Sequence, residues 1–208
     1  MEKYVTLVFD DGPNDYLIKM VDKIDSYGFK AAFAIIGNKI NDETQKSLKY
    51  AIDKGFELVS HGQNHLHLER LEEKEVIYEL TEPIKEVEKR LGYKITLARL
   101  PFLSYNNNVF EISKQLGLGL LGMGMEGGSD WSDETTPEII SEAVVRTATD
   151  GGVACLHVRL NTLKALDVIL PELKNQDFIL VTPSELLKIK GIENVPLGIN
   201  IDNISDFI

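Results

Sequence analysis

The four histidines of the chain stand at positions that suit metal binding and proton transfer. His61 and His65 are four residues apart, His67 follows two residues later, and His157 closes a separate apolar run. On a helical turn, a spacing of four places two imidazoles on one face, where they can share a metal ion. Two histidines with one carboxylate leave positions open for water, which is typical of a catalytic metal site. The alternative is a solvated loop that carries histidines without a ligand.

Two adjacent carboxylates, Asp10 and Asp11, follow the apolar run Tyr4–Phe9 and precede Gly12 and Pro13. Gly-Pro favours a turn, so the pair could simply end a strand. Two carboxylates at a buried strand end are costly to ionise together, however. A bound cation, or a role that tolerates a raised pKa, would relieve that cost.

Three other places carry side chains that could take part in chemistry. Arg99 could hold a carboxylate in its ionised form, or it could be a surface residue before a turn. Asp130 could orient an imidazole, and Trp131, the only tryptophan, could supply an apolar wall for a carbohydrate. Both could equally anchor a loop. His157 could be either a proton donor or a hydrogen-bonded core histidine.

Short apolar runs alternate with longer amphipathic segments along the chain, and these elements must position the candidate residues. The apolar runs are Tyr4–Phe9, Ala31–Ile36, Phe56–Ser60, Ile95–Leu100, Leu118–Met123, Val153–His157 and Phe178–Thr182. Strands without a polar face, alternating with helices, predict a parallel sheet that helices cover. About seven such units favour an α/β fold of the β/α-barrel kind, compact and incomplete, with seven or eight strands. A doubly wound open sheet is the alternative, although the first strand lacks the glycine fingerprint of dinucleotide folds.

The candidate residues share one place in this pattern. Asp10, His61, Arg99, Asp130 and His157 each lie at or just beyond the C-terminal end of a predicted strand. In β/α barrels that end of the strands carries the active site. Five such residues from five strands therefore predict a single site.

Composition narrows the classes of function. The 208 residues fit a single domain, 1–208, in which we leave the tail 192–208 unassigned. A net charge of −11 makes nucleic acid an unfavourable partner, and no apolar run is long enough to span a membrane. The single cysteine, Cys155, excludes an internal disulfide and a multi-cysteine zinc site. We see no signal peptide, so we expect a cytoplasmic protein or a domain cut from a secreted one, and a monomer.

Taken in order, these residues resemble the motifs of the NodB-type polysaccharide deacetylases, the fourth family of carbohydrate esterases. The resemblance rests on residues 8–13 (VFDDGP), 61–65 (HGQNH), 99–102 (RLPF), 130–131 (DW) and 153–157 (VACLH). The stretch 163–191 is also similar to bacterial acetylxylan esterase domains of this family. Together these segments cover most of the chain.

The resemblance implies a distorted β/α barrel, one divalent cation, zinc or cobalt, and an acetylated polysaccharide or oligosaccharide as substrate. By the same resemblance, the metal ligands are Asp11, His61 and His65, and Asp10 is the base that deprotonates the attacking water. Arg99 pairs with Asp10, while His157 is the general acid with Asp130 as its orienting partner. The backbone N–H of Phe102 is implied as an oxyanion donor.

The sequence departs from the family pattern at several of these positions. Phe102 stands where a tyrosine is usual, Gly127 replaces the first aspartate of the DxxDW motif, and Cys155 replaces a leucine expected to line the acetate pocket. Gly62 replaces a serine or threonine that could support the histidine loop. Because glycine adds backbone freedom, we expect a loosely held cation and tighter binding in Gly62→Ser, unless residue 62 is left-handed.

Two questions of function stay open at this point. A non-catalytic carbohydrate-binding or metal-binding relative with the same fold is the alternative to an enzyme. Within the enzymes, O-acetyl xylan and polymers of N-acetylglucosamine, such as chitin oligomers or peptidoglycan, are both candidate substrates. The resemblance of residues 163–191 tilts the choice slightly towards acetylxylan.

Overall fold

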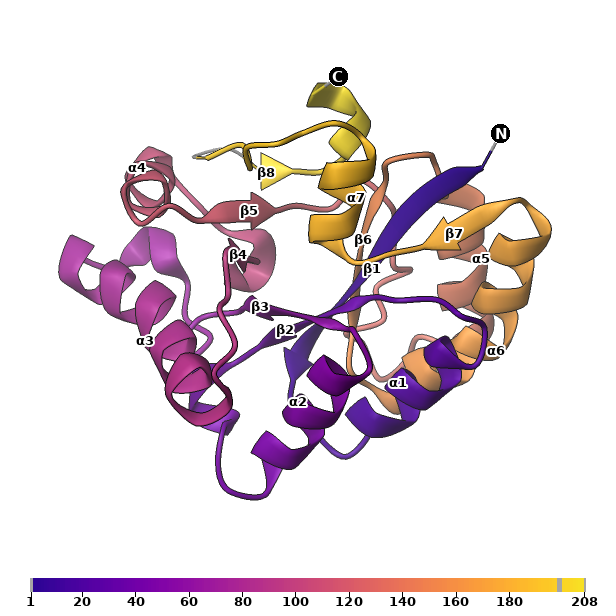
Figure 1. Cartoon of the computed structure of the whole chain (residues 1–208), viewed down its shortest axis with the longest axis horizontal. Helices are drawn as coiled ribbons and strands as arrows, with labels where there is room; N and C mark the ends of the chain where they lie inside the picture. The colour runs from indigo at the N-terminus through magenta and orange to yellow at the C-terminus, as the bar shows by residue number, and fades with distance from the viewer. Residues whose placement is uncertain (1, 198–199, 208) are drawn as a thin grey trace.

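The structure is a computed structural model that describes residues 2–197 and 200–207. Its named strands pair in parallel, in the order β6-β1-β2-β3-β4-β5-β8, and β7 pairs with the first part of β1 (Figure 1). The strands are β1 (Lys3–Gly12), β2 (Ala32–Ile35), β3 (Glu57–Ser60), β4 (Leu97–Ala98), β5 (Gly119–Leu121), β6 (Val153–His157), β7 (Phe178–Leu180) and β8 (Asn200–Ile201). Each of the seven predicted apolar runs contributes one of these strands.

The two ends of the sheet approach each other and nearly close a barrel. Beyond β8, the carbonyl of Asp202 accepts a hydrogen bond from Val153 N in β6 (3.2 Å). Beyond β5, Met125 N donates to the carbonyl of Val153 (3.1 Å). The prediction of a distorted, incomplete β/α barrel is therefore confirmed, and the open-sheet alternative is wrong.

Most of the helices cover the outside of this sheet (Figure 1). The helices are α1 (Leu17–Asp25), α2 (Thr44–Asp53), α3 (Glu73–Leu91), α4 (Asn107–Gln115), α5 (Pro137–Thr147), α6 (Leu160–Asn175) and α7 (Pro183–Ile189), with short 3-10 turns η1 (Gly37–Lys39), η2 (Leu68–Arg70), η3 (Pro101–Leu103) and η4 (Ile204–Phe207). Among the described residues, no helix has both the length and the apolar character that crossing a membrane requires.

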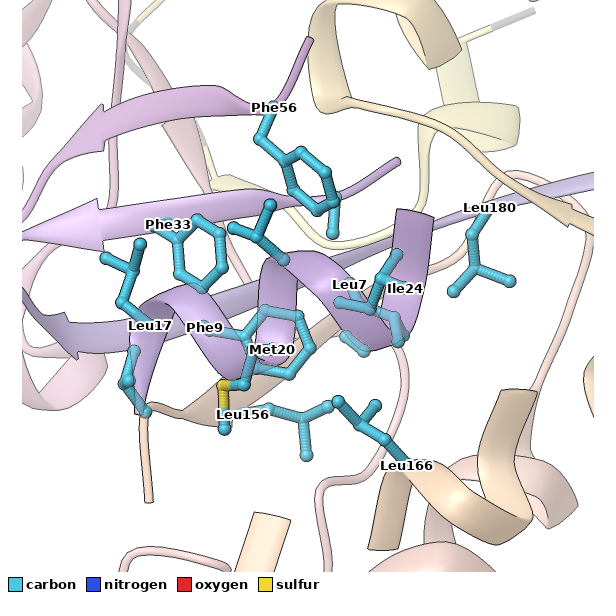
Figure 2. Packing of buried hydrophobic residues seen from close by; sticks show 14 of the residues in the cluster. Leu7, Phe9, Leu17, Met20, Ile24, Phe33, Phe56, Leu156, Leu166 and Leu180 are labelled. Atoms are coloured by element: carbon cyan, nitrogen blue, oxygen red, sulfur yellow. The ribbon is translucent and has the colours of Figure 1, made fainter. Parts of the chain in front are cut away.

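Strand β1 separates two hydrophobic clusters because successive side chains of a strand point to opposite faces. Leu7 and Phe9 pack outwards against Leu17 and Met20 of α1, as Figure 2 shows. Val8 points the other way, into a cluster with small and branched residues from the other strands, which is the barrel interior. Two residues beyond Val8, Asp10 lies on this inner face, at the end where the interior opens into the candidate site.

The C-terminal segment completes the barrel. Helix α7 begins with a capping box in which Thr182 and Glu185 exchange hydrogen bonds, and its Leu186 and Leu187 pack into the interior cluster. Strand β8 then pairs with β5. Both elements are absent from the sequence-based prediction, because each is short and weakly periodic. Gly198 and Ile199 of the tail lie outside the described residues.

Candidate active site

Three residues from two strand ends form a cluster of candidate metal ligands. Asp11 lies at the end of β1, and His61 and His65 lie in the loop that follows β3. Asp11 Oδ1 is 3.6 Å from Nε2 of His61 and 3.3 Å from Nε2 of His65, and one ligand atom from each residue falls within 4.8 Å of the other two. These are the three ligands that the resemblance implies.

The protonation of this cluster fits a cation. Nδ1 of His61 lies 2.8 Å from the carbonyl oxygen of Arg99, which can only accept, so Nδ1 carries a proton, and in the neutral ring Nε2 presents its lone pair to Asp11. Asp11 Oδ1 is buried and has no hydrogen-bond partner among the described residues. A carboxylate oxygen and an imidazole lone pair that face each other repel unless a positive charge lies between them. The residues therefore suit a divalent metal ion with nitrogen and oxygen ligands.

The surroundings also favour the deprotonated forms that metal ligands require. Burial raises the pKa of the Asp11 carboxyl, but the imidazoles of His61, His65 and His157 outweigh it, and the pKa falls well below its usual value. For His65, burial and the neighbouring His61 lower the pKa of the imidazole. An ionised carboxylate and a neutral imidazole are the forms that bind metal.

A backbone irregularity brings both carboxylates of the Asp-Asp pair to the site. On a regular strand, adjacent side chains point to opposite faces, so Asp10 and Asp11 would diverge. The pairing of β1 with β2 shifts register between Phe9 and Gly12, and Asp11 has a left-handed φ of 68°. This bulge turns Asp11 towards the histidines while Asp10 stays on the inner face.

The histidine loop is not helical, contrary to the turn that the spacing of four suggests. Gly62 has φ 77° and His65 has φ 56°, both in the left-handed region, and the two imidazole centroids are 4.9 Å apart. The condition attached to Gly62→Ser therefore fails, because a side chain at this φ is strained. A Cβ at residue 62 would also lie 3.2 Å from Oε2 of Glu79. Gly62→Ser is therefore not expected to bind the metal ion more tightly.

Asp10 lies beside Arg99 in a buried setting. Asp10 is 3% exposed and Arg99 is 1% exposed. Arg99 Nε is 3.8 Å from Asp10 Oδ1, an ion pair without a hydrogen bond, while the Cys155 thiol donates to Asp10 Oδ2 at 3.3 Å. Burial lowers the pKa of Arg99, but the charge of Asp10 reverses the effect, so the guanidinium stays charged. Burial, and then the charge of Asp10, raise the pKa of the Cys155 thiol, which stays protonated as a donor.

His157 is tightly bound to Asp130. Asp130 accepts from His157 Nδ1 and from His157 N, both at 2.7 Å, and from Thr162 Oγ1 at 2.7 Å. The Nδ1 nitrogen carries the proton because a carboxylate only accepts, and Nε2 is the nitrogen free to exchange a proton. Burial lowers the pKa of His157, but the bond to Asp130 more than compensates, and the pKa lies above its usual value.

Phe102 packs against the cluster, and Trp131 is exposed in the loop after β5. Phe102, in η3, is 54% exposed, and its ring centroid lies 4.5 Å from that of His65. The ring of His67 stacks on the ring of Phe102, at a centroid distance of 4.0 Å and an interplanar angle of 8°. Trp131 is 62% exposed, and its carbonyl accepts a hydrogen bond from Arg159.

The absence of a side chain at residue 127 has a steric reason. A Cβ on Gly127 would lie 2.2 Å from the carbonyl oxygen of Cys155. The loop after β5 therefore packs its backbone directly against β6, and the first aspartate of the family pattern has no room here.

His67 lies outside the candidate metal cluster. Its Nδ1 is 3.3 Å from Oε1 of Glu69, and its ring stacks on the ring of Phe102. We expect His67→Ala to retain one equivalent of metal and most of the activity, because no candidate ligand is removed. Metal analysis of the purified variant checks this, and stoichiometric loss of metal would show that His67 is a ligand.

Two polar residues of the site escaped the sequence analysis. Thr162, in the first turn of α6, donates to Asp130. Glu79, in α3, accepts two hydrogen bonds from Asn64 in the histidine loop. For Glu79 a signal was present, since it falls on the apolar face of the helix with Val76 and Leu80. For Thr162 the sequence holds no comparable signal.

The fold and the site together place the chain among enzymes built on a parallel β/α barrel, with functional side chains at the C-terminal ends of the strands. The sequence model of the polysaccharide deacetylase family matches residues 1–121. The chain belongs to this family.

Individual relatives agree with that membership. The chain is 31% identical to a peptidoglycan-N-acetylglucosamine deacetylase of Bacillus cereus over 195 residues, which are 91% of this chain and 90% of that protein. It is 27% identical to a bifunctional xylanase/deacetylase of Pseudobutyrivibrio xylanivorans over 194 residues, which are 92% of this chain but 31% of that protein. A family 4 acetyl xylan esterase from Clostridium thermocellum in complex with a cobalt ion superimposes with a TM-score of 0.89 at 28% identity, covering 97% and 98% of the two chains.

Proposed function

We propose that this protein is a metal-dependent hydrolase that removes acetyl groups from a polysaccharide. The observation that carries the proposal is the arrangement at the end of the barrel. An Asp–His–His cluster is accompanied by the buried Asp10–Arg99 pair and by His157, held by Asp130. These are the groups that acyl transfer to water requires: a site for a Lewis acid, a base and an acid.

We assign Asp11, His61 and His65 as the ligands of one divalent cation, zinc or cobalt. A cation bound there would lower the pKa of a coordinated water and polarise the acetyl carbonyl. The cobalt ion in the related esterase and the unpaired, buried Asp11 Oδ1 support this assignment.

Asp10 is proposed as the base that accepts a proton from the attacking water. Arg99 keeps a positive charge close to Asp10 and so favours its ionised form. Asp10 Oδ2 accepts a hydrogen bond from the Cys155 thiol. Asp10 Oδ1 is buried and has no hydrogen-bond partner among the described residues, so it is the oxygen that can accept the proton. We propose that the buried Cys155 also lines the acetate pocket.

His157 is proposed as the general acid that protonates the leaving group. Asp130 fixes the Nδ1–H tautomer and supports the positive charge of the imidazolium, and Thr162 holds Asp130 in turn. Protonation of the leaving group from Nε2 would accompany collapse of the tetrahedral intermediate. We assign the backbone N–H of Phe102 as the donor to its oxyanion, and exposed Trp131 as an apolar wall for the sugar.

Loss of metal is predicted to abolish activity. Dialysis against a chelator should stop the hydrolysis of a simple acetyl ester, and added zinc or cobalt should restore it, because the proposed acid and base alone lack the Lewis acid. The assay measures acetate release before and after chelation. Full activity of the chelated, metal-free protein would contradict the proposed metal dependence.

The substrate is proposed to be O-acetylated xylan or a polymer of N-acetylglucosamine. Relatives named for xylan and for peptidoglycan support the two choices equally. Acetate release from acetylated xylan, chitin oligomers and peptidoglycan separates them. Failure on all three by metal-loaded protein would favour the non-catalytic alternative.

A further inference from the structure

The loop that presents both histidine ligands contains two left-handed residues, Gly62 and His65. A non-glycine residue at positive φ, such as His65, is unfavourable unless its surroundings hold it. The loop therefore needs support from elsewhere in the fold. Gln63 and Asn64 lie between these two residues.

One side of the loop is held by backbone contacts with the segment that follows β2. Gly37 N donates to the carbonyl of Gly62 (3.0 Å), and Asn38 N donates to the carbonyl of Gln63 (2.9 Å). These bonds fix the first half of the loop, next to His61. They do not reach the backbone of Asn64, which directly precedes His65. From this side Asn38 Nδ2 reaches Asn64 through a long, exposed bond to its Oδ1 (3.4 Å).

Glu79 holds the second half from α3. One carboxylate oxygen, Oε2, accepts from Asn64 N at 2.8 Å, and the other, Oε1, accepts from Asn64 Nδ2 at 2.6 Å. Glu79 is 2% exposed, so these bonds form away from competing water. Both oxygens of this buried carboxylate accept hydrogen bonds from Asn64. The two bonds fix the position and the orientation of the backbone at Asn64.

We propose that Glu79 is a positioning residue that sets the affinity of the site for its metal ion. It holds Asn64, and thereby the left-handed backbone of His65, in the conformation that directs Nε2 towards Asp11. The support that a serine or threonine at residue 62 would give comes instead from this carboxylate. The inference rests on the metal site of the proposed function.

The test compares zinc binding by the metal-free wild type and Glu79→Gln in calorimetric titrations. A glutamine oxygen can still accept from Asn64 N, but its NH2 group then faces the NH2 group of Asn64. If the Asn64 amide turns over to accept from the glutamine, its bond from Asn38 Nδ2 is lost instead, so one hydrogen bond is lost in either orientation. We expect zinc affinity to fall ~10–100-fold, the range for loss of outer-shell support. Glu88→Gln, an exposed position of the same helix, is the matched control and should bind as the wild type does.

A second substitution distinguishes positioning from general damage to the fold. In Glu79→Gln combined with Asn64→Asp, the glutamine NH2 can donate to the new carboxylate while its oxygen still accepts from the backbone N–H. Both hydrogen bonds are restored, so zinc affinity should recover towards that of the wild type. If Glu79→Gln does not fold, Asn64→Ala removes the side-chain bond to Glu79, together with the longer, exposed bond from Asn38, and should weaken zinc binding in the same direction.

The possible failures are separable. Equal zinc affinity in wild type and Glu79→Gln, or in wild type and Asn64→Ala where that variant is used, would overturn the role of Glu79. A loss of affinity in Glu79→Gln that Asn64→Asp leaves unrepaired would also overturn it. Absence of zinc and cobalt binding by the wild type would instead overturn the metal site of the proposed function, and the inference with it.

Discussion

Asp10→Asn is expected to retain the metal ion and to lose nearly all deacetylase activity. Asparagine has almost the same shape as aspartate but cannot accept a proton from water, and loss of a general base costs ~10²–10⁴-fold in rate. The three candidate ligands, Asp11, His61 and His65, are untouched. Acetate release and metal content, measured on the same preparation, check both halves of the prediction.

Two further variants serve as controls for Asp10→Asn. Asp15→Asn removes a charge at an exposed position nearby and should leave the rate unchanged. His61→Ala removes a candidate ligand and should lose both metal and activity. Removing the charge of Asp10 leaves Arg99 buried and unpaired, and breaking a buried pair costs about 3–5 kcal/mol, so thermal unfolding is measured alongside. A folded Asp10→Asn with a rate within about tenfold of the wild type would show that Asp10 is not the base.

The sequence predicts the barrel well because its signals are local and repeated. Each predicted apolar run became a strand, and residues at the ends of parallel strands necessarily gather at one edge of the sheet. Asp10, His61 and His157 could therefore be placed near one another without coordinates. Strand β8 and helix α7 could not be predicted, because two to seven residues carry too little periodicity.

Within the site, the features that the sequence could not reveal depend on backbone conformation and on distant partners. Alternation along β1 would have separated Asp10 from Asp11, and only the bulge brings them together. At residue 62, the glycine suggested a flexible loop, whereas its left-handed φ favours glycine and the bonds that Asn64 donates to Glu79 hold the loop. Glu79 lies in a helix 15 residues further along the chain from Asn64, a pairing that spacing does not encode.

His157→Ala is expected to have an effect that depends on the leaving group. Expulsion of an amine or a sugar alkoxide needs a proton, so the rate on N-acetyl or O-acetyl sugars should fall ~10²–10⁴-fold. A nitrophenolate leaves without protonation, so hydrolysis of 4-nitrophenyl acetate should fall far less. Parallel rate measurements on the two kinds of substrate test this. An equal loss on both would show that His157 does something other than protonate the leaving group.

The pH dependence of the wild type gives an independent check of the same assignment. Burial lowers the pKa of His157, but the hydrogen bond and the charge of Asp130 raise it by more, so the pKa of His157 lies above its usual value. A general acid acts only while it is protonated. Activity on acetylated sugars should therefore persist below this raised pKa and be lost as the pH rises through it.

In Asp130→Asn the stabilising charge is gone and burial remains, so the alkaline fall in activity should move to lower pH, together with a loss in rate. Profiles of kcat against pH for the two proteins measure the shift. An alkaline limb that does not move would mean that the limb reports a group other than His157, and that the bond between His157 and Asp130 serves structure alone.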